Sequence, residues 1–463
     1  MANFEKNLIA TSTLDFYTVL QTIRTYLTSK CSDLLNIIND NSSSDKENVR
    51  ESNKEKLTNI ISSYISSQKL SVSGMTNSEL VARIYKEVAE FSILTDYIKD
   101  INNEIEEINV NAWNDVEVIY SDGRVKKAPH FENLEHATMV ITKLTKACDS
   151  NLNDAHPMAE GSLNTNTRVV TLKNPVVDEE VGVACSIRLL KPNIATRDFF
   201  IKHGTITEKE MKFLELAIRS GVSMVFVGST GSGKTTLMNY LLSTIPNSQR
   251  VITIEHNARE LNLVKTDKDG NVVNNVVHTQ TRTFPKDEDM NISQEDLLVK
   301  ALRLDPNVIC VGEMRDAEAY AAEEASLTGH TVVTSLHADG VRATHHRIAT
   351  LALKRFPMDI NVALLQASMA FPLVICLRKL GDNSRRVMQI AECSIAEDST
   401  GIIRDYTSLF EFVIKKSQVT NGEWSITDSE HRSDGVPSKE LLQKMVQNGA
   451  SIEELEEFGY EYK

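Results

Sequence analysis

The chain has 463 residues, of which 41% are apolar and 25% charged, a composition typical of a globular protein with more than one core. Its formal net charge of −14 argues against bulk binding of DNA or RNA and against broad adsorption to anionic lipid, because both need a basic surface. The 6 cysteines form no CxxC pair, so no zinc module is indicated.

The first hundred residues are polar and favour helices. The run NSSSDKENVRESNKEK, at 41–56, is typical of a solvated linker or an exposed helix. Apolar residues at helical spacing predict a helix over 80–98. We therefore expect residues 1–100 to form a helical N-terminal extension.

Residues 101–193 have the pattern of a small α+β domain. Alternating apolar and polar residues on either side of Asp122-Gly123 predict a hairpin. We expect a helix over 134–148 and a strand in TRVVTLKNPV. Residues 194–208 have the composition of a linker.

The second half of the chain alternates short apolar runs with helical stretches, which predicts a parallel sheet covered by helices on both faces. The first helix begins at a capping box formed by Thr207 and Glu210. We place this α/β domain at 209–405 and an extension at 406–463. The most apolar stretch, 362–377, is expected to be a core segment, since a membrane span needs about 20 apolar residues.

A glycine-rich segment, GSTGSGKTT, follows the first apolar strand and matches the P-loop pattern GxxxxGK[ST]. Its glycines permit backbone angles that bring amide N–H groups close to phosphate oxygens. Lys234 can reach the β- and γ-phosphates of ATP, and the Thr235 hydroxyl can bind Mg²⁺. The expected ATP contacts are Gly228, Ser229, Thr230, Gly231, Ser232, Gly233, Lys234, Thr235 and Thr236.

Hydrolysis also requires a group that positions or activates water. Two glutamates follow apolar strands: Glu313 ends PNVICVGE, and Glu255 ends RVITIE. A parallel sheet would aim both carboxylates at the edge where ligands bind. Each can equally be a solvated residue at the end of a strand.

Two histidines, His330 and His337, flank another apolar run in TGHTVVTSLHADG. A neutral imidazole there can bind a γ-phosphate or the catalytic carboxylate. From the residues alone, the favoured interpretation is a pair of ordinary polar residues at strand ends. We expect the neighbouring pair His345-His346 to lie on the surface.

The succession of the P-loop, TIE, LRLDPNVICVGEMRD and TGHTVVTSLHAD resembles the secretion and pilus ATPases of the type II/type IV superfamily. In that family these segments are the Walker A motif, the Asp box, the Walker B motif and the His box. Upstream, INVNAWNDVEVIYSDGRV and TRVVTLKNPVVDEE are similar to the N-terminal domain of the Tad pilus (CpaF-like) branch. The resemblance implies a RecA-like P-loop NTPase domain behind a smaller, PAS-like α+β domain.

The resemblance also implies a function and a location. Such enzymes are homohexamers in the cytoplasm that dock on an inner-membrane platform protein. They hydrolyse ATP with Mg²⁺ to power pilus assembly, pilus retraction or protein secretion. The membrane would therefore be reached only through partners.

Residue roles follow from the same motifs. Glu313 matches the Walker B glutamate, Glu255 the Asp-box glutamate, and His337 and His330 the His-box region. Arg168 and Arg188 match arginines of the N-terminal domain that contact nucleotide. Arg282 matches an arginine ahead of the Walker B helix, and we expect it to contact nucleotide too, although each of the three can equally form a surface ion pair.

One departure from the family pattern concerns the Asp box, which normally reads Glu-Asp and here reads Glu255-His256. A lost carboxylate could weaken the organisation of metal or water. A nucleotide-gated structural ring with little turnover is therefore a second hypothesis. A conjugation-type DNA or protein transfer ATPase is a third, which the acidic charge disfavours.

Overall fold

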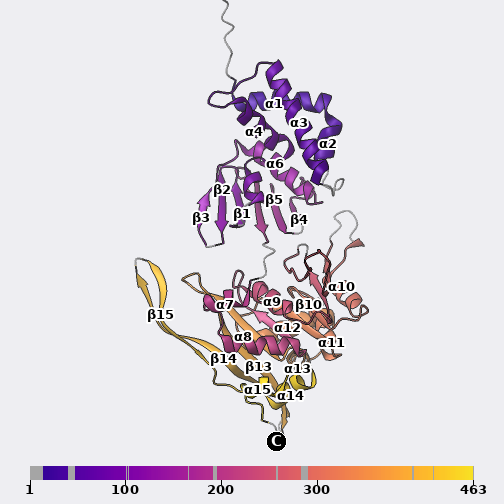
Figure 1. Ribbon diagram of the computed structural model, residues 1–463, viewed down its shortest axis with the longest axis vertical. Helices are drawn as coiled ribbons and strands as arrows, with labels where there is room; N and C mark the ends of the chain where they lie inside the picture. The colour runs from indigo at the N-terminus through magenta and orange to yellow at the C-terminus, as the bar shows by residue number, and fades with distance from the viewer. Residues whose placement is uncertain are drawn as a thin grey trace, which may run out of the picture. The chain divides into compact units, whose positions relative to one another are not determined.

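The computed structural model describes residues 14–39, 47–100, 102, 104–121, 123–164, 166–190, 195–256, 259–282, 290–398, 401–420 and 422–461 (Figure 1). The chain divides into two compact units, Met1–Leu190 and Lys191–Lys463. The start of the polar run 41–56 and Asp122 of the expected hairpin lie outside the described residues. The rest of that run begins a helix, which was one of the two expectations for it.

The N-terminal unit begins with a run of helices, the first four of which share an apolar core. Their bounds are Phe16–Lys30 (α1), Ser32–Asn39 (α2), Glu47–Ser67 (α3), Asn77–Ala89 (α4), the 3-10 turn Ser92–Leu94 (η1) and Thr95–Lys99 (α5). Leu20, Ile61 and Ile84, from three of these helices, are buried in one cluster. The helix predicted over 80–98 is interrupted, because Ser92 adopts a φ of 53°, which an α-helix cannot contain.

An antiparallel sheet forms the rest of this unit. Its strands are Ile105–Ala112 (β1), Asp115–Tyr120 (β2), Val125–Lys127 (β3), Met158–Asn164 (β4), Thr167–Lys173 (β5) and Val183–Leu189 (β6). Their order in the described residues is β3-β2-β1-β6-β5-β4. Helix α6 (Leu134–Ala147) lies between this sheet and the N-terminal helices (Figure 1). The predicted hairpin, helix and strand are thereby confirmed.

The second unit is built on one mixed sheet. Its strands are Met224–Val227 (β7), Arg250–Glu255 (β8), Asn275–Gln280 (β9), Val308–Val311 (β10), Thr331–Leu336 (β11), Leu373–Lys379 (β12), Arg385–Asp398 (β13), Gly401–Thr420 (β14) and Glu423–Arg432 (β15). The order is β15-β14-β13-β12-β7-β11-β10-β8-β9. The strands from β12 to β9 in this order are parallel, as predicted, and β13, β14 and β15 add an antiparallel meander.

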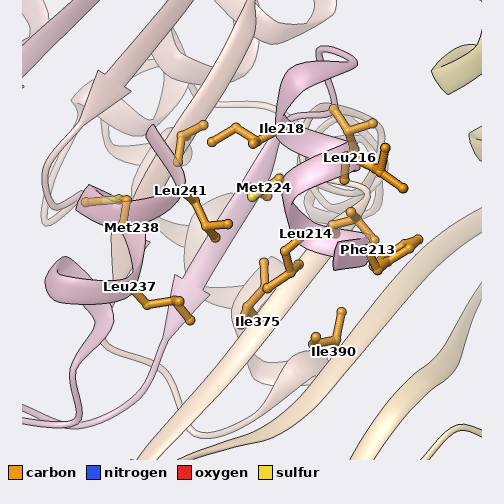
Figure 2. Packing of buried hydrophobic residues seen from close by; sticks show 14 of the residues in the cluster. Phe213, Leu214, Leu216, Ile218, Met224, Leu237, Met238, Leu241, Ile375 and Ile390 are labelled. Carbon is orange, nitrogen blue, oxygen red and sulfur yellow. The ribbon is translucent and has the colours of Figure 1, made fainter. Parts of the chain in front are cut away.

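Helices cover both faces of this sheet. Their bounds are Arg197–Lys202 (α7), Glu208–Arg219 (α8), Lys234–Ser243 (α9), Gln294–Ala301 (α10), Glu318–Leu327 (α11), Val341–Arg355 (α12), Ile360–Ala370 (α13), Lys439–Gln447 (α14) and Ile452–Glu456 (α15). Figure 2 shows Phe213 of α8 and Leu237 of α9 in the cluster that packs on Met224 of β7. Val225 and Val227, which alternate with Met224, enter the core on the opposite face, so β7 is apolar throughout.

Two segments differ from the division expected from the sequence. The segment 194–208 contains helix α7, and the Phe200 side chain of this helix is buried in the core of the second unit. The segment 406–463 contributes β15 and most of β14 to the same sheet. Its residues Leu442 and Phe458 lie in the same apolar cluster as α8 and α9.

The apolar stretch 362–377 is a core segment, as predicted, and contributes most of α13 and β12. Within the described residues, no helix has the length and apolar character that crossing a membrane requires. The surface position expected for His345 is wrong. Its side chain is fully buried on α12, and its Nε2 lies 2.9 Å from the carbonyl oxygen of Phe371, to which it donates. Burial lowers the pKa of His345 to about 4 and keeps the ring neutral.

Candidate nucleotide site

The P-loop leaves β7 at Val227 and enters α9 at Lys234, so it lies at the carboxyl edge of the parallel strands. Gly228 has a φ of +147°, and a Cβ there would lie 2.1 Å from the carbonyl oxygen of Leu377 on β12. Gly233, the N-cap of α9, has a φ of 94°. The first glycine is therefore required by close backbone approach and the second by backbone conformation.

Lys234 is buried, with a relative exposure of only 7%. Its Nζ donates to the carbonyl oxygens of Gly228 at 2.8 Å and Ser229 at 2.9 Å. Nearby, the Oγ of Ser232 is buried and has no hydrogen-bond partner among the described residues. A buried ammonium, a buried hydroxyl and the amino end of α9 together fit a phosphate group. Thr235, in the first turn of α9, fits Mg²⁺ through its hydroxyl.

His337 joins this loop to Glu313. Leu336 of β11 is paired with Val227 of β7, so the residues that follow them leave the sheet side by side. The Nδ1 of His337 lies 2.9 Å from the carbonyl oxygen of Gly228, and its Nε2 lies 3.1 Å from Oε1 of Glu313. A carbonyl oxygen only accepts, so Nδ1 carries a proton, and Nε2 can donate to the carboxylate only when both ring nitrogens are protonated. Oε1 of Glu313 is buried and has no other hydrogen-bond partner among the described residues. The guanidinium of Arg315 also pairs with Glu313.

Glu255 is placed differently. Its side chain is almost fully buried, and Oε2 accepts the backbone N–H groups of Glu260 at 2.6 Å and Leu261 at 2.8 Å. Its Oε1 accepts the hydroxyl of Thr253 at 3.2 Å. In this conformation the carboxylate holds the chain that follows β8, and both of its oxygens are engaged.

The remaining predicted residues of this unit are spread along the sheet. The Nδ1 of His256 lies 3.2 Å from Oγ1 of Thr281. The backbone of Arg282 pairs with that of Ile292, and its side chain is exposed. His330 precedes β11 while His337 follows it, so the length of the strand separates them by roughly 20 Å. The structure therefore brings His337 to the P-loop, at the carboxyl ends of the parallel strands, and leaves His330 at their amino ends.

Arg168 and Arg188 lie on neighbouring strands of the N-terminal unit. They are directly opposite one another in the β5–β6 pairing. Val169 and Ile187, the next residues along, are buried against α6, so the two arginines share the other face of the sheet. Arg168 pairs with Glu160 on β4.

Sequence reasoning missed Arg385, the first residue of β13. Its Nε donates to the carbonyl oxygen of Gly231 at 2.9 Å. The only signal was a pair of arginines at the start of a strand, far along the chain from the P-loop. An open cavity of about 770 Å³ lies beside Gly228 and His337 and is bounded by Arg378 and Phe412.

A family model described as Type II/IV secretion system protein matches residues 99–455. The chain belongs to this family. The match includes the whole P-loop, Glu313 and His337, and it also includes the sheet that carries Arg168 and Arg188. Helices α1 to α4 lie outside it.

The chain is also similar, over part of its length, to individual proteins. The chain is 29% identical over 244 residues to the uncharacterized protein MJ0900 of Methanocaldococcus jannaschii, covering 52% of this chain and 41% of that protein. It is 29% identical over 247 residues to the type IV secretion system protein PtlH of Bordetella pertussis, covering 49% of this chain and 68% of that protein. The X-ray structure of the Legionella pneumophila ATPase DotB is 20% identical, with a TM-score of 0.44, over 68% of this chain and 79% of that chain.

Proposed function

We propose that this chain hydrolyses ATP and converts the reaction into mechanical work as a homohexamer. The observation that carries the proposal is the chain of contacts from the P-loop through His337 to Glu313. A phosphate-binding loop alone indicates only nucleotide binding. A carboxylate tied to that loop supplies the second requirement, a group that can accept a proton from water.

Each residue at the loop has a defined role in this proposal. Lys234 turns its ammonium from the loop carbonyls to the β- and γ-phosphates and neutralises charge there. Thr235 would hold Mg²⁺, which when bound supplies further positive charge to the phosphate oxygens. Glu313 orients a water molecule, whose oxygen attacks the γ-phosphorus as the bond to the β–γ bridging oxygen breaks. The carboxylate takes up the proton that the water releases. His337 holds the carboxylate in position by donating from Nε2, which requires protons on both ring nitrogens.

We propose that the arginine pair of the N-terminal unit also contacts nucleotide phosphates. Like charges directly opposite one another in a sheet are destabilising unless an anion offsets them. Glu160 pairs with Arg168, and Glu107 of β1 lies directly opposite Arg188. We propose that nucleotide phosphates replace these carboxylates as the partners of the two arginines. We assign Arg282 a similar contact. Glu255 would organise water only after its hydrogen bonds to Thr253, Glu260 and Leu261 are released. His330 would need to contribute to the reaction from the amino end of β11, away from the P-loop.

We further propose that the second unit acts as a RecA-like motor domain and the sheet of the first unit as a PAS-like partner domain. The family match supports work in a secretion system. We propose that this work is pilus assembly, pilus retraction or protein secretion, with the ring docked from the cytoplasm on an inner-membrane platform protein. The segments quoted upstream of the P-loop favour the Tad pilus branch. The net charge of −14 gives no support to a DNA transfer motor.

A nucleotide-gated ring with little turnover is the second candidate. The observation that favours it is Glu255, whose two oxygens are engaged by the chain itself, together with a histidine at the next position. This candidate requires tight ATP binding without hydrolysis.

Steady-state phosphate release at several protein concentrations distinguishes the two candidates. Glu313→Gln is compared with wild type and with Glu453→Gln, which removes the same charge at an exposed position on α15. The motor proposal expects turnover that rises more than linearly with concentration and falls on the order of 10²–10⁴-fold in Glu313→Gln alone. Equal turnover in all three proteins would exclude Glu313 from the reaction, and binding with no turnover in wild type would favour the second candidate.

A further inference from the structure

Arg385 holds one side of the P-loop. Its Nε–H group donates to the carbonyl oxygen of Gly231, and its Cδ lies 3.4 Å from the position that a Cβ on Gly233 would occupy. The hydrogen bond and the aliphatic contact together fix the arm of the loop between these two glycines. A charged donor of this kind typically forms a stronger hydrogen bond than a neutral one.

The two residues that follow Arg385 hold a different segment. Arg386 donates from its guanidinium to the carbonyl oxygen of His203 at 2.8 Å. The backbone N–H of Val387 donates to the carbonyl oxygen of Thr205 at 2.8 Å. Residues 203–205 directly follow α7. The first three residues of β13 therefore contact both the P-loop, through Arg385, and the end of α7, through Arg386 and Val387.

Helix α7 also contacts the helix that the P-loop caps. The ring of Phe200 on α7 lies 5.6 Å from that of Tyr240 on α9, centroid to centroid. The Tyr240 hydroxyl donates to Glu215 of α8, and Nε of Arg197 lies 3.3 Å from the same carboxylate. Helix α7 is thus fixed to both ends of the phosphate-binding element, at the loop through β13 and at the helix through Tyr240.

We propose that Arg385 is a positioning residue that transmits phosphate occupancy of the P-loop to α7, the first helix after the junction with the N-terminal unit. This inference rests on the proposed function for the movement of Lys234. When phosphate draws the Lys234 ammonium away, the carbonyl oxygens of Gly228 and Ser229 each lose one of two donors and keep only His337 and the Ser232 N–H group, respectively, so the loop rearranges. Gly231 moves with the loop, Arg385 follows its hydrogen-bond acceptor, and Arg386 carries the displacement to the carbonyl oxygen of His203.

Hydrogen exchange of the full chain, with and without Mg²⁺-ADP, tests this coupling. Two segments are followed, the P-loop with the start of α9 and the segment 199–205. The variants are Arg385→Gln, which cuts the link at the loop, and Arg386→Gln, which cuts it at α7. The control is Arg432→Gln on β15, a half-exposed arginine that pairs with Glu430 and contacts neither segment.

In wild type and Arg432→Gln, the nucleotide should slow exchange at both segments, by at least about 5-fold at 199–205, the low end of a typical coupling between sites. In Arg385→Gln and Arg386→Gln, protection of the P-loop should persist while the effect at 199–205 falls below about 2-fold. A structural role alone would raise exchange at 199–205 equally with and without nucleotide, and that outcome would overturn the proposal. Wild type with protection at the P-loop and none at 199–205 overturns it as well. Protection at neither segment overturns the proposed nucleotide site and this inference with it.

Discussion

Glu323, on the buried face of α11, allows a quantitative test of how a buried carboxyl group changes the free energy of unfolding with pH. Its side chain is 1% exposed, and neither carboxylate oxygen has a hydrogen-bond partner among the described residues. Burial raises the pKa of Glu323 from 4.5 to about 8, and the charge of Glu324 adds to the rise. The carboxyl therefore stays protonated in the folded protein at neutral pH.

The sign of the pH dependence follows from this difference. The folded state keeps the proton up to about pH 8, whereas the unfolded chain releases it near pH 4.5. The free energy of unfolding should therefore fall as the pH rises through this window and level off above it. The full difference in pKa corresponds to at most about 5 kcal/mol.

Glu323→Gln removes the titration and keeps the shape of a protonated carboxyl. We expect this variant to match wild type within about 1 kcal/mol at pH 5 and to exceed it by several kcal/mol at pH 9. Calorimetric unfolding at both pH values measures the difference, with Glu453→Gln as the exposed control. An equal effect of Glu323→Gln at pH 5 and pH 9 would refute the reasoning.

Four further substitutions test individual contacts of the site. His337→Asn should lower turnover on the order of 10- to 100-fold with little change in ATP affinity, because the shorter side chain releases Glu313 from the P-loop. A loss of ATP affinity in equilibrium titrations would instead show that His337 contributes to nucleotide binding. Gly228→Ala should cost about 1–3 kcal/mol of stability and most of the ATP affinity, because its Cβ meets the carbonyl oxygen of Leu377. Gly231→Ala adds the strain of an alanine at a φ of 72°, but its Cβ meets no atom within 4 Å, so it should lower stability and ATP affinity less in the same denaturation and binding assays. Glu255→Gln should lower stability by about 1–3 kcal/mol, because a neutral amide oxygen accepts the N–H groups of Glu260 and Leu261 more weakly than a carboxylate oxygen does. Unchanged stability with reduced turnover would indicate a catalytic role.

The elements that the sequence predicts well are those with a local signal. The strand before the P-loop is apolar at every position because both faces of the sheet are covered, and the loop glycines mark the turn into α9. A parallel sheet also fixes the direction of each strand. The distance between His330 and His337 could therefore have been anticipated from their places before and after the same strand.

Other features depend on tertiary structure. Arg385 reaches the P-loop only because β13 folds back beside β12, which brings it to a carbonyl group 154 residues away in the chain. Helix α7 has 6 residues, and its one buried side chain is Phe200. A single buried position in so short a helix produces no periodic pattern in the sequence. His345 is a different case, since it lies on the same helical face as Val341 and Ile348, and this spacing predicts a buried position.

The most direct test of the proposed reaction is a single-turnover experiment with enzyme in excess over Mg²⁺-ATP. Wild type should convert the bound ATP to ADP and phosphate, Glu313→Gln should retain bound ATP, and Lys234→Ala should bind neither nucleotide. ATP recovered unchanged from wild type, or ADP formed at the same rate by Glu313→Gln, would contradict the assignment of this site as an ATP hydrolase.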